Sequence, residues 1–126
     1  MNHPENLKYA KTHEYAQTLP DGHVRVGITD FAQKQLGDLV FVNLPQPGDP
    51  VTAGEAFGDL ESVKAVADVV SPVTGTVCAV NEELLDAPEK INQDPYGAWL
   101  MEVENPEVED GLMDSAAYEA FLQTEK

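Results

Sequence analysis

Short runs of apolar, often β-branched residues fill the middle of the chain, and turn-forming residues separate them. Runs of about five residues with this composition are typical of strands linked by turns. We therefore expect a mostly β protein, built as a small sandwich or flattened barrel. The predicted strands lie in "GHVRVGI" (22–28), "DLVFVNL" (38–44), "AFGDLES" (56–62), "AVADVVS" (65–71), "GTVCAVN" (75–81) and "AWLMEVE" (98–104).

Two segments rich in Pro and Gly divide these runs. They are "PQPGDPVTAG" (45–54) and "SPVTG" (71–75). Proline presets the turn dihedrals and glycine supplies a positive φ, so we expect both segments to reverse the chain.

Helical patterns are short and lie at the margins of the strand region. Asp30 can cap a helix together with Gln33, and Gly37 ends that pattern. "DAPEKIN" (86–92) predicts one turn with Pro88 at its first helical position. A C-terminal helix is expected over about 114–123, with a stripe that packs on the sheet. The stripe consists of Tyr118, Phe121 and Leu122.

Length and composition indicate one compact unit. The 126 residues suit a single domain, and no low-complexity linker divides the chain. The 7 basic and 23 acidic residues give a formal net charge of −16. Such a potential repels phosphate backbones and anionic lipids, so we expect no nucleic-acid or membrane partner, and it favours a basic surface on another protein.

The N-terminal residues and the single cysteine bear on the compartment. The start lacks the pattern of a signal or transit peptide, and no apolar run is long enough to cross a bilayer. Cys78 is the only cysteine, which suits a reducing compartment, and it lies in a predicted strand. We expect a cytoplasmic protein in which Cys78 is a buried, inert thiol.

Metal and catalytic motifs do not emerge from the sequence. His3, His13 and His23 have no Cys or carboxylate around them at ligand spacing, and no phosphate loop or nucleophile elbow is present. Many carboxylates could do acid–base work, yet nothing distinguishes one pair from a solvated acidic face. We therefore expect no metal site and no catalytic residues.

A lone cation interrupts this acidic surface. Lys64 is the only Lys or Arg between Lys34 and Lys90. Two predicted strands flank it closely, which predicts a hairpin over about 55–70 with Lys64 at its tip. A type I turn with Ser62 at its first position fits the sequence. The surrounding acids are Glu55, Asp59, Glu61 and Asp68.

Three interpretations of Lys64 remain open from the residues alone. It can be an ordinary surface lysine. It can be a Schiff-base nucleophile, but that role needs a lowered pKa, and the neighbouring carboxylates favour the charged amine. It can also be an attachment point, where an enzyme adds a prosthetic group to a lysine displayed on a stiff turn.

The motifs as a set resemble the H proteins of glycine cleavage systems over nearly the whole chain. "YAKTHEY" (9–15), "GITDFAQ" (27–33), "ESVKA" (61–65), "NQDPYGAW" (92–99) and "YEAFL" (118–122) follow one another in that family's order and at nearly its spacing. The resemblance implies the barrel-sandwich hybrid fold of lipoyl carriers, with lipoic acid joined to Lys64 through an amide.

The resemblance also implies a function and a set of partners. The lipoyl group accepts an aminomethyl group when the pyridoxal-phosphate P protein decarboxylates glycine. The T protein passes the one-carbon unit to tetrahydrofolate, and the flavoprotein L, a dihydrolipoamide dehydrogenase, reoxidises the arm. Lipoate-attachment enzymes are further partners. The chain is then a non-catalytic shuttle, which we expect to be a monomer.

In the family, a surface cleft shelters the loaded arm, and a glutamate of the "HE" pair can meet its amine. Here that residue is Glu14, and Asp68 is a second candidate, because a carboxylate suits an aminomethyl cation. Three positions depart from the family pattern. Tyr15 stands where Trp is common, Ala67 where Ser is frequent, and "PYGAWL" (95–100) is one residue shorter than usual.

Two alternatives to the H-protein assignment stay in view. A lipoyl or biotinyl domain of another acyl-transfer complex would also present a lysine on a hairpin. Biotin carriers usually show Met-Lys-Met, however, which "SVKAV" (62–66) does not. An unmodified interaction module is the remaining alternative.

Overall fold

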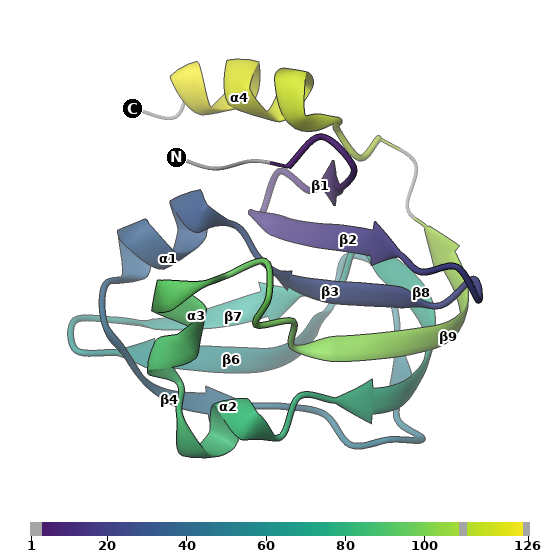
Figure 1. Cartoon of the computed structure of the whole chain (residues 1–126), viewed down its shortest axis with the longest axis horizontal. Coiled ribbons are helices and arrows are strands. Elements are labelled where there is room, and N and C mark those ends of the chain that lie inside the picture. Colours follow the sequence, from purple (N-terminus) through teal and green to yellow (C-terminus); the bar gives the residue numbers. More distant parts are fainter. Residues whose placement is uncertain (1–3, 109–110, 125–126) are drawn as a thin grey trace.

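The computed structural model describes residues 4–108 and 111–124, which form two antiparallel sheets with short helices around them (Figure 1). The larger sheet has the order β1-β2-β3-β9-β8-β5, and the smaller has the order β4-β6-β7. The prediction of a mostly β sandwich is confirmed. The strands are β1 (Lys8–Tyr9), β2 (Glu14–Thr18), β3 (Val24–Ile28), β4 (Leu39–Asn43), β5 (Pro50–Val51), β6 (Ala56–Ser62), β7 (Val66–Val70), β8 (Val73–Val80) and β9 (Met101–Val108).

All six predicted strands occur, as β3, β4, β6, β7, β8 and β9. The sequence missed β1, β2 and β5. β1 and β5 have only two residues each, too few for a periodic pattern. β2 begins with Glu14, whose side chain is buried, so a charged residue stands where the strand pattern would require an apolar one.

The segment "SPVTG" does not reverse the chain as predicted. Only Ser71 and Pro72 form a bend, and Val73 already begins β8. A Cβ on Gly75 would lie 2.6 Å from Cγ1 of Val103 on β9. This glycine therefore permits close approach of two strands instead of supplying a turn. The longer segment does turn, with φ of 98° at Gly48 and 88° at Gly54.

Two apolar clusters fill the interior of the sandwich. The first joins the inner face of the small sheet to the helices, and the second lies against β3, β8 and β9. Phe57 packs against both clusters. Each fully buried aliphatic side chain contributes about 1.5–3 kcal/mol. The helices are α1 (Asp30–Leu36), α2 (Glu83–Asp86), α3 (Glu89–Gln93) and α4 (Ser115–Gln123).

Helix α1 begins at Asp30, one residue earlier than expected, because Asp30 was predicted to be its cap. Thr29 is the N-cap, and its Oγ1 accepts a hydrogen bond from the amide of Ala32 at 3.2 Å. Asp30 is instead the first helical residue, and its carboxylate accepts from the Gln33 side chain at 2.8 Å. Gly37 ends the helix with φ of 82°, as predicted.

Helix α3 likewise differs from the predicted helix in its first residue. Pro88 has helical dihedrals but occupies the cap position, and the helix runs from Glu89 to Gln93. The short α2 just before it was not predicted.

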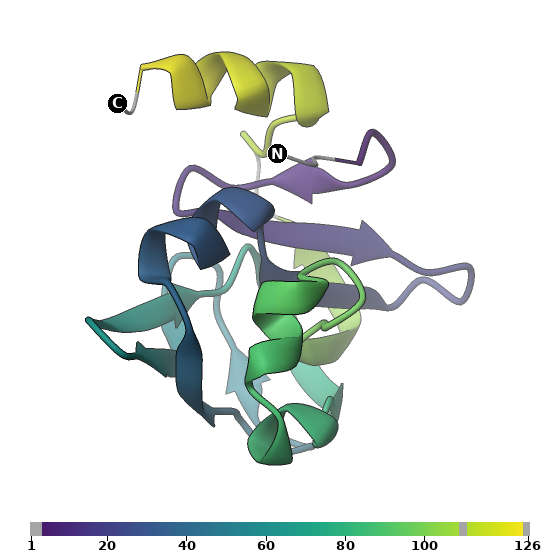
Figure 2. The same ribbon diagram turned by 60° about the vertical axis from the view of Figure 1, so that its left-hand side comes forward.

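Helix α4 lies over β1 at one end of the molecule (Figure 2). Tyr118 and Leu122 are buried there, and Phe121 is half-buried. The Tyr118 ring stacks on Tyr9 with 4.7 Å between centroids. A third cluster results, which we call the aromatic end; its buried members are Leu7, Tyr9, Tyr15, Tyr118 and Leu122. In the described residues, no helix has the length and hydropathy needed to span a bilayer.

Candidate functional site

The β6–β7 hairpin places Lys64 at its tip, between the strands that end at Ser62 and begin at Val66. The Ser62 amide donates to the Ala65 carbonyl at 2.8 Å. The Ser62 hydroxyl accepts from the amides of Lys64 and Ala65 at 3.2 and 3.0 Å. A hydrogen-bonded type I turn would use the Ser62 carbonyl for this purpose, so here the side chain closes the turn.

The tip is held against the start of β4. The amide of Val63 donates to the carbonyl of Asp38 at 3.1 Å. The Lys64 side chain is exposed and lies over Gly37, where an added Cβ would stand 3.3 Å from Cε of the lysine. Sequence reasoning used Gly37 only as a helix end and missed that its bare backbone makes room for this lysine stem.

Exposed apolar side chains surround the tip. Val40 and Phe41 on β4 are 54% and 52% exposed, and Val63 and Val66 are 70% and 67% exposed. Phe41 pairs in register with Glu61, which in turn pairs with Val66, so the three share one face. We call Val40, Phe41, Val63 and Val66 the tip patch. Among the described residues, no ion pair engages Lys64.

A surface cleft of about 170 Å³ lies between α1 and the inner face of the hairpin. Ala32 and Leu36 of α1 form one side. Leu60 and Val69 of the hairpin, together with Ile28 at the end of β3, form the apolar remainder. Leu36, which lines the cleft, directly precedes Gly37, and the Lys64 side chain lies over Gly37. The cleft is therefore next to the Lys64 side chain.

Glu14 lies in this cleft with a buried side chain. Its carboxylate accepts a hydrogen bond from the Thr12 hydroxyl and, at 3.2 Å, from the amide of Val70 at the end of β7. The preceding His13 has a φ of 74°, in the left-handed region where His is among the more tolerated residues. These contacts fix the Glu14 carboxylate in the wall of the cleft, next to its apolar residues.

Asp68 and Ala67 border the same cleft from the edge strand β7. Ala67 pairs in register with Leu60 and therefore faces inward. Asp68 is exposed and pairs with Asp59, which puts these two acids on the opposite face of the hairpin. Glu14 is thus the carboxylate inside the cleft, and Asp68 lies at its rim.

Tyr15 is buried at the aromatic end and does not line the cleft. Its ring covers Gly27, where an added Cβ would lie 2.6 Å from the phenol oxygen. Its hydroxyl donates to the carbonyls of Pro95 and Tyr96 at 3.1 and 3.3 Å. Two of the three departures from the family pattern, Tyr15 and the shortened "PYGAWL", therefore contact each other.

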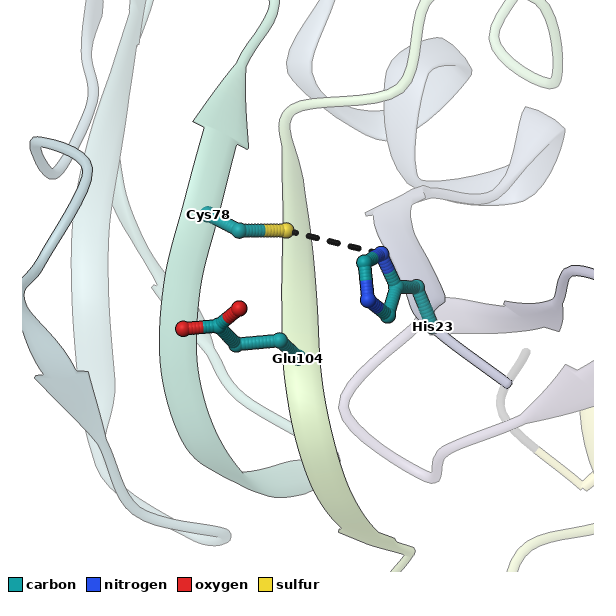
Figure 3. Close-up of side chains that lie close together, drawn as sticks. All are labelled: His23, Cys78 and Glu104. Carbon is teal, nitrogen blue, oxygen red and sulfur yellow. Dashed lines mark hydrogen bonds between the residues drawn. The ribbon is translucent and has the colours of Figure 1, made fainter. Parts of the chain in front are cut away.

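A second polar group lies on the larger sheet at β3, β9 and β8, and there the prediction that Cys78 is buried is wrong. Cys78 is partly buried, and its Sγ lies 3.7 Å from Nδ1 of His23 (Figure 3). Burial and the nearby Glu102 raise the pKa of the thiol. The hydrogen bond between His23 and Glu102 raises the histidine pKa and lowers the carboxyl pKa. These residues meet because β3, β9 and β8 are neighbours in the sheet. Their spacing along the sequence could not predict this contact.

The family model described as "Glycine cleavage H-protein" matches residues 7–125. A probable glycine cleavage system H protein of Pyrococcus horikoshii is 53% identical over 123 residues, covering 95% of this chain and 92% of the relative. The glycine cleavage system H protein of Lachnoclostridium phytofermentans is 52% identical over 121 residues, covering 96% and 95%.

A solved structure gives the same picture of the fold. The crystal structure of a glycine cleavage system H protein from Mycobacterium marinum superposes with a TM-score of 0.88 at 41% identity, covering 98% of this chain and 99% of that one. The expected barrel-sandwich fold of lipoyl carriers is thereby confirmed.

Proposed function

Because this chain belongs to the glycine cleavage H-protein family, we propose that it carries lipoic acid on Lys64 and shuttles the aminomethyl group from the P protein to the T protein. The observation that carries the proposal is the position of Lys64, exposed at the tip of a hairpin whose turn is closed by Ser62 and anchored to Asp38. A modifying enzyme needs an accessible amine at a fixed position, and this tip supplies both.

The residues present fit a lipoyl group. The amide would neutralise Lys64, which removes the only cation of residues 35–89 from the acidic surface. The apolar cleft next to Gly37 suits a hydrocarbon arm, since Leu36 and Leu60 offer it a dry surface. When bound, the group supplies a disulfide that can take up an aminomethyl group and two electrons.

The residues of this chain position the lipoyl arm and shelter its aminomethyl group. Glu14 is held by Val70 and Thr12 in the cleft, where its carboxylate can pair with an aminomethyl ammonium. Asp68 can attract the same cation at the rim. We assign no catalytic residue, and the chain acts as a non-catalytic carrier.

The remaining expectations belong to the same proposal. The chain acts as one lipoyl-carrier domain over residues 1–126, as a monomer in the cytoplasm, and is reoxidised by the L protein. Its net charge of −16 suits basic surfaces on the P, T and L proteins.

The tip patch is assigned to one partner, the lipoate-attachment enzyme, because that enzyme must reach Lys64 itself. Apolar Val63 and Val66 stand beside the acidic Asp38 and Glu61, a combination that complements an apolar surface edged with basic residues. A Val63→Ser change should slow lipoylation, whereas Leu85→Ser, at a side chain 54% exposed on α2 outside the tip patch, should not.

The decisive experiment is the intact mass of full-length protein made with lipoate and an attachment pathway. One lipoyl increment is expected on the wild type and none on Lys64→Arg, with fragmentation locating the group on Lys64. A known lipoyl carrier modified in the same cells is the control. An unmodified wild type beside a modified control would refute the carrier assignment.

The role of Glu14 has its own test. Loaded with the aminomethyl group, Glu14→Gln should lose it to water faster than the wild type, because the ammonium has lost its carboxylate partner. Glu107→Gln, an exposed acid on β9, should behave like the wild type. Equal lifetimes for the Glu14 variant and the wild type would remove Glu14 from the shelter.

A further inference from the structure

The turn between β2 and β3, which ends at His23, lies on the side of the molecule opposite the β6–β7 hairpin (Figure 1). Val24, Val103 and Val77 pair in register across β3, β9 and β8, and all three are buried. Their chain neighbours His23, Glu102, Glu104 and Cys78 therefore emerge together on the outer face of the sheet. We propose that these four residues form a Zn²⁺ site.

The distances fit tetrahedral coordination. Zn–S and Zn–N bonds of about 2.3 and 2.05 Å at a tetrahedral angle place the two ligand atoms about 3.6 Å apart. The observed separation from Cys78 Sγ to His23 Nδ1 is 3.7 Å. Cys78 Sγ lies 3.6 Å from Oε2 of Glu102, against about 3.6 Å for an S–Zn–O pair.

We assign the fourth ligand to Glu104, whose carboxylate lies below the Cys78 side chain in Figure 3 and has to turn toward His23 to complete the site. One ligand atom each from His23, Cys78 and Glu104 lie within 4.8 Å of one another. Within the described residues, no hydrogen bond or ion pair engages the Glu104 carboxylate, so nothing holds it away from an ion.

The ion would replace the hydrogen bonds that now join His23, Cys78 and Glu102. Nδ1 of His23 lies 2.9 Å from Oε2 of Glu102, a hydrogen-bond distance that must open to about 3.4 Å on coordination. Binding sends the thiol proton of Cys78 to solvent, and the imidazole keeps its remaining proton on Nε2. Oε1 of Glu102 stays with Nε of Arg25 at 3.1 Å, which orients the ligand from outside.

The donor set selects the metal. One thiolate, one imidazole and two carboxylates suit a borderline-soft ion without a geometric preference of its own, which describes Zn²⁺, whereas Ca²⁺ and Mg²⁺ require oxygen ligands alone. The ion would fasten β3, β8 and β9 together and stabilise the folded chain by mass action, without reaching Lys64.

The test uses the full-length Lys64→Arg protein, so that no lipoyl thiol competes for metal. We expect one Zn²⁺ per chain by competition with a chromogenic chelator, a raised melting temperature, and protection of Cys78 from alkylation. Co²⁺ should give a thiolate-to-metal charge-transfer band. Cys78→Ser, His23→Gln and Glu104→Gln should each weaken Zn²⁺ binding roughly tenfold or more, since even outer-shell changes commonly cost that much.

Two control variants make the result specific. Glu107→Gln removes an exposed acid from the same strand, and Asp21→Asn removes a carboxylate 3.5 Å from His23 that the proposed site does not use. Both should retain the charge-transfer band and the protection of Cys78. A wild type with no band, or Zn²⁺ affinity equal in Cys78→Ser and its parent, would overturn the site and leave only ions held loosely by the acidic surface. Circular dichroism of each variant ensures that lost binding is not lost folding.

Discussion

The hairpin tip and the aromatic end use apolar residues in opposite ways. Val63 and Val66 stand 70% and 67% exposed beside Lys64, whereas Tyr9, Tyr15 and Tyr118 are fully buried. At the tip, backbone and hydroxyl hydrogen bonds fix the turn, and the apolar side chains stay exposed. At the aromatic end, ring packing joins α4 to the sheet. Apolar side chains that stabilise the fold and apolar side chains that stay exposed therefore lie in separate regions of the molecule.

The largest expected effect is at the aromatic end. Tyr118→Ala should lower the free energy of unfolding by about 3–5 kcal/mol, because it leaves a cavity beside Tyr9 and removes the hydroxyl that bonds Thr29 and His13. Val63→Ala at the tip should change it by less than about 0.5 kcal/mol. Urea titrations measure both. Similar decreases in the free energy of unfolding for Tyr118→Ala and Val63→Ala would contradict the proposed difference between the two regions.

A pH experiment should also separate the two regions. Burial raises the pKa of Tyr96 to about 12 and raises that of Tyr15 further, from an ordinary value of 10. The folded state thus holds phenol protons that the unfolded chain releases, so stability is fully present below pH 10 and is lost as the pH rises toward 12 and beyond.

The variant for this experiment is Tyr15→Phe, measured by denaturant unfolding at a series of alkaline pH values. The free energy of unfolding of this variant should fall less steeply above pH 10 than that of the wild type. The difference between the two proteins should amount to about 1.4 kcal/mol for each unit by which folding raises the pKa of Tyr15. The hairpin, residues 56–70, contains no tyrosine and should not contribute. Parallel curves for the two proteins would contradict the prediction.

At the tip itself the expected effects are smaller. Ser62→Ala removes the acceptor for the amides of Lys64 and Ala65, and should cost about 0.5–1.5 kcal/mol. Lipoylation should slow because Lys64 is held less firmly. Ser62→Thr keeps a hydroxyl and serves as the matched control. Modification rates that do not differ between the Ala and Thr variants would show that the turn needs no hydroxyl.

The smallest effect concerns the cleft wall. Ala67 lines the cleft without a hydroxyl, so we expect the lipoyl arm to leave more readily than in an Ala67→Ser variant. Stability should change by less than about 0.5 kcal/mol, and NMR relaxation of the labelled arm should show slower motion in the variant. Equal mobility in the two proteins would rule this effect out.

The sequence predicted the position of Lys64 at a hairpin tip, because the determinants of that hairpin are local. Lys64 lies between two strand patterns a few residues apart, and Ser62 is a turn residue, so the tip was readable from the chain. The contact between Gly37 and Lys64 could not be predicted, because it depends on how α1 packs against the hairpin. Cys78 was placed on the correct strand but given the wrong environment, because the identity of the neighbouring strands was unknown.

The sequence by itself determined the six main strands, the end of α1 at Gly37 and the buried stripe of α4, because period and turn chemistry act over a few residues. Only the tertiary structure decided that Glu14 is held inside the cleft while Asp68 stays at its rim, and that His23 meets Cys78. Those outcomes depend on strand order and register, which long-range packing selects and no short stretch of sequence encodes.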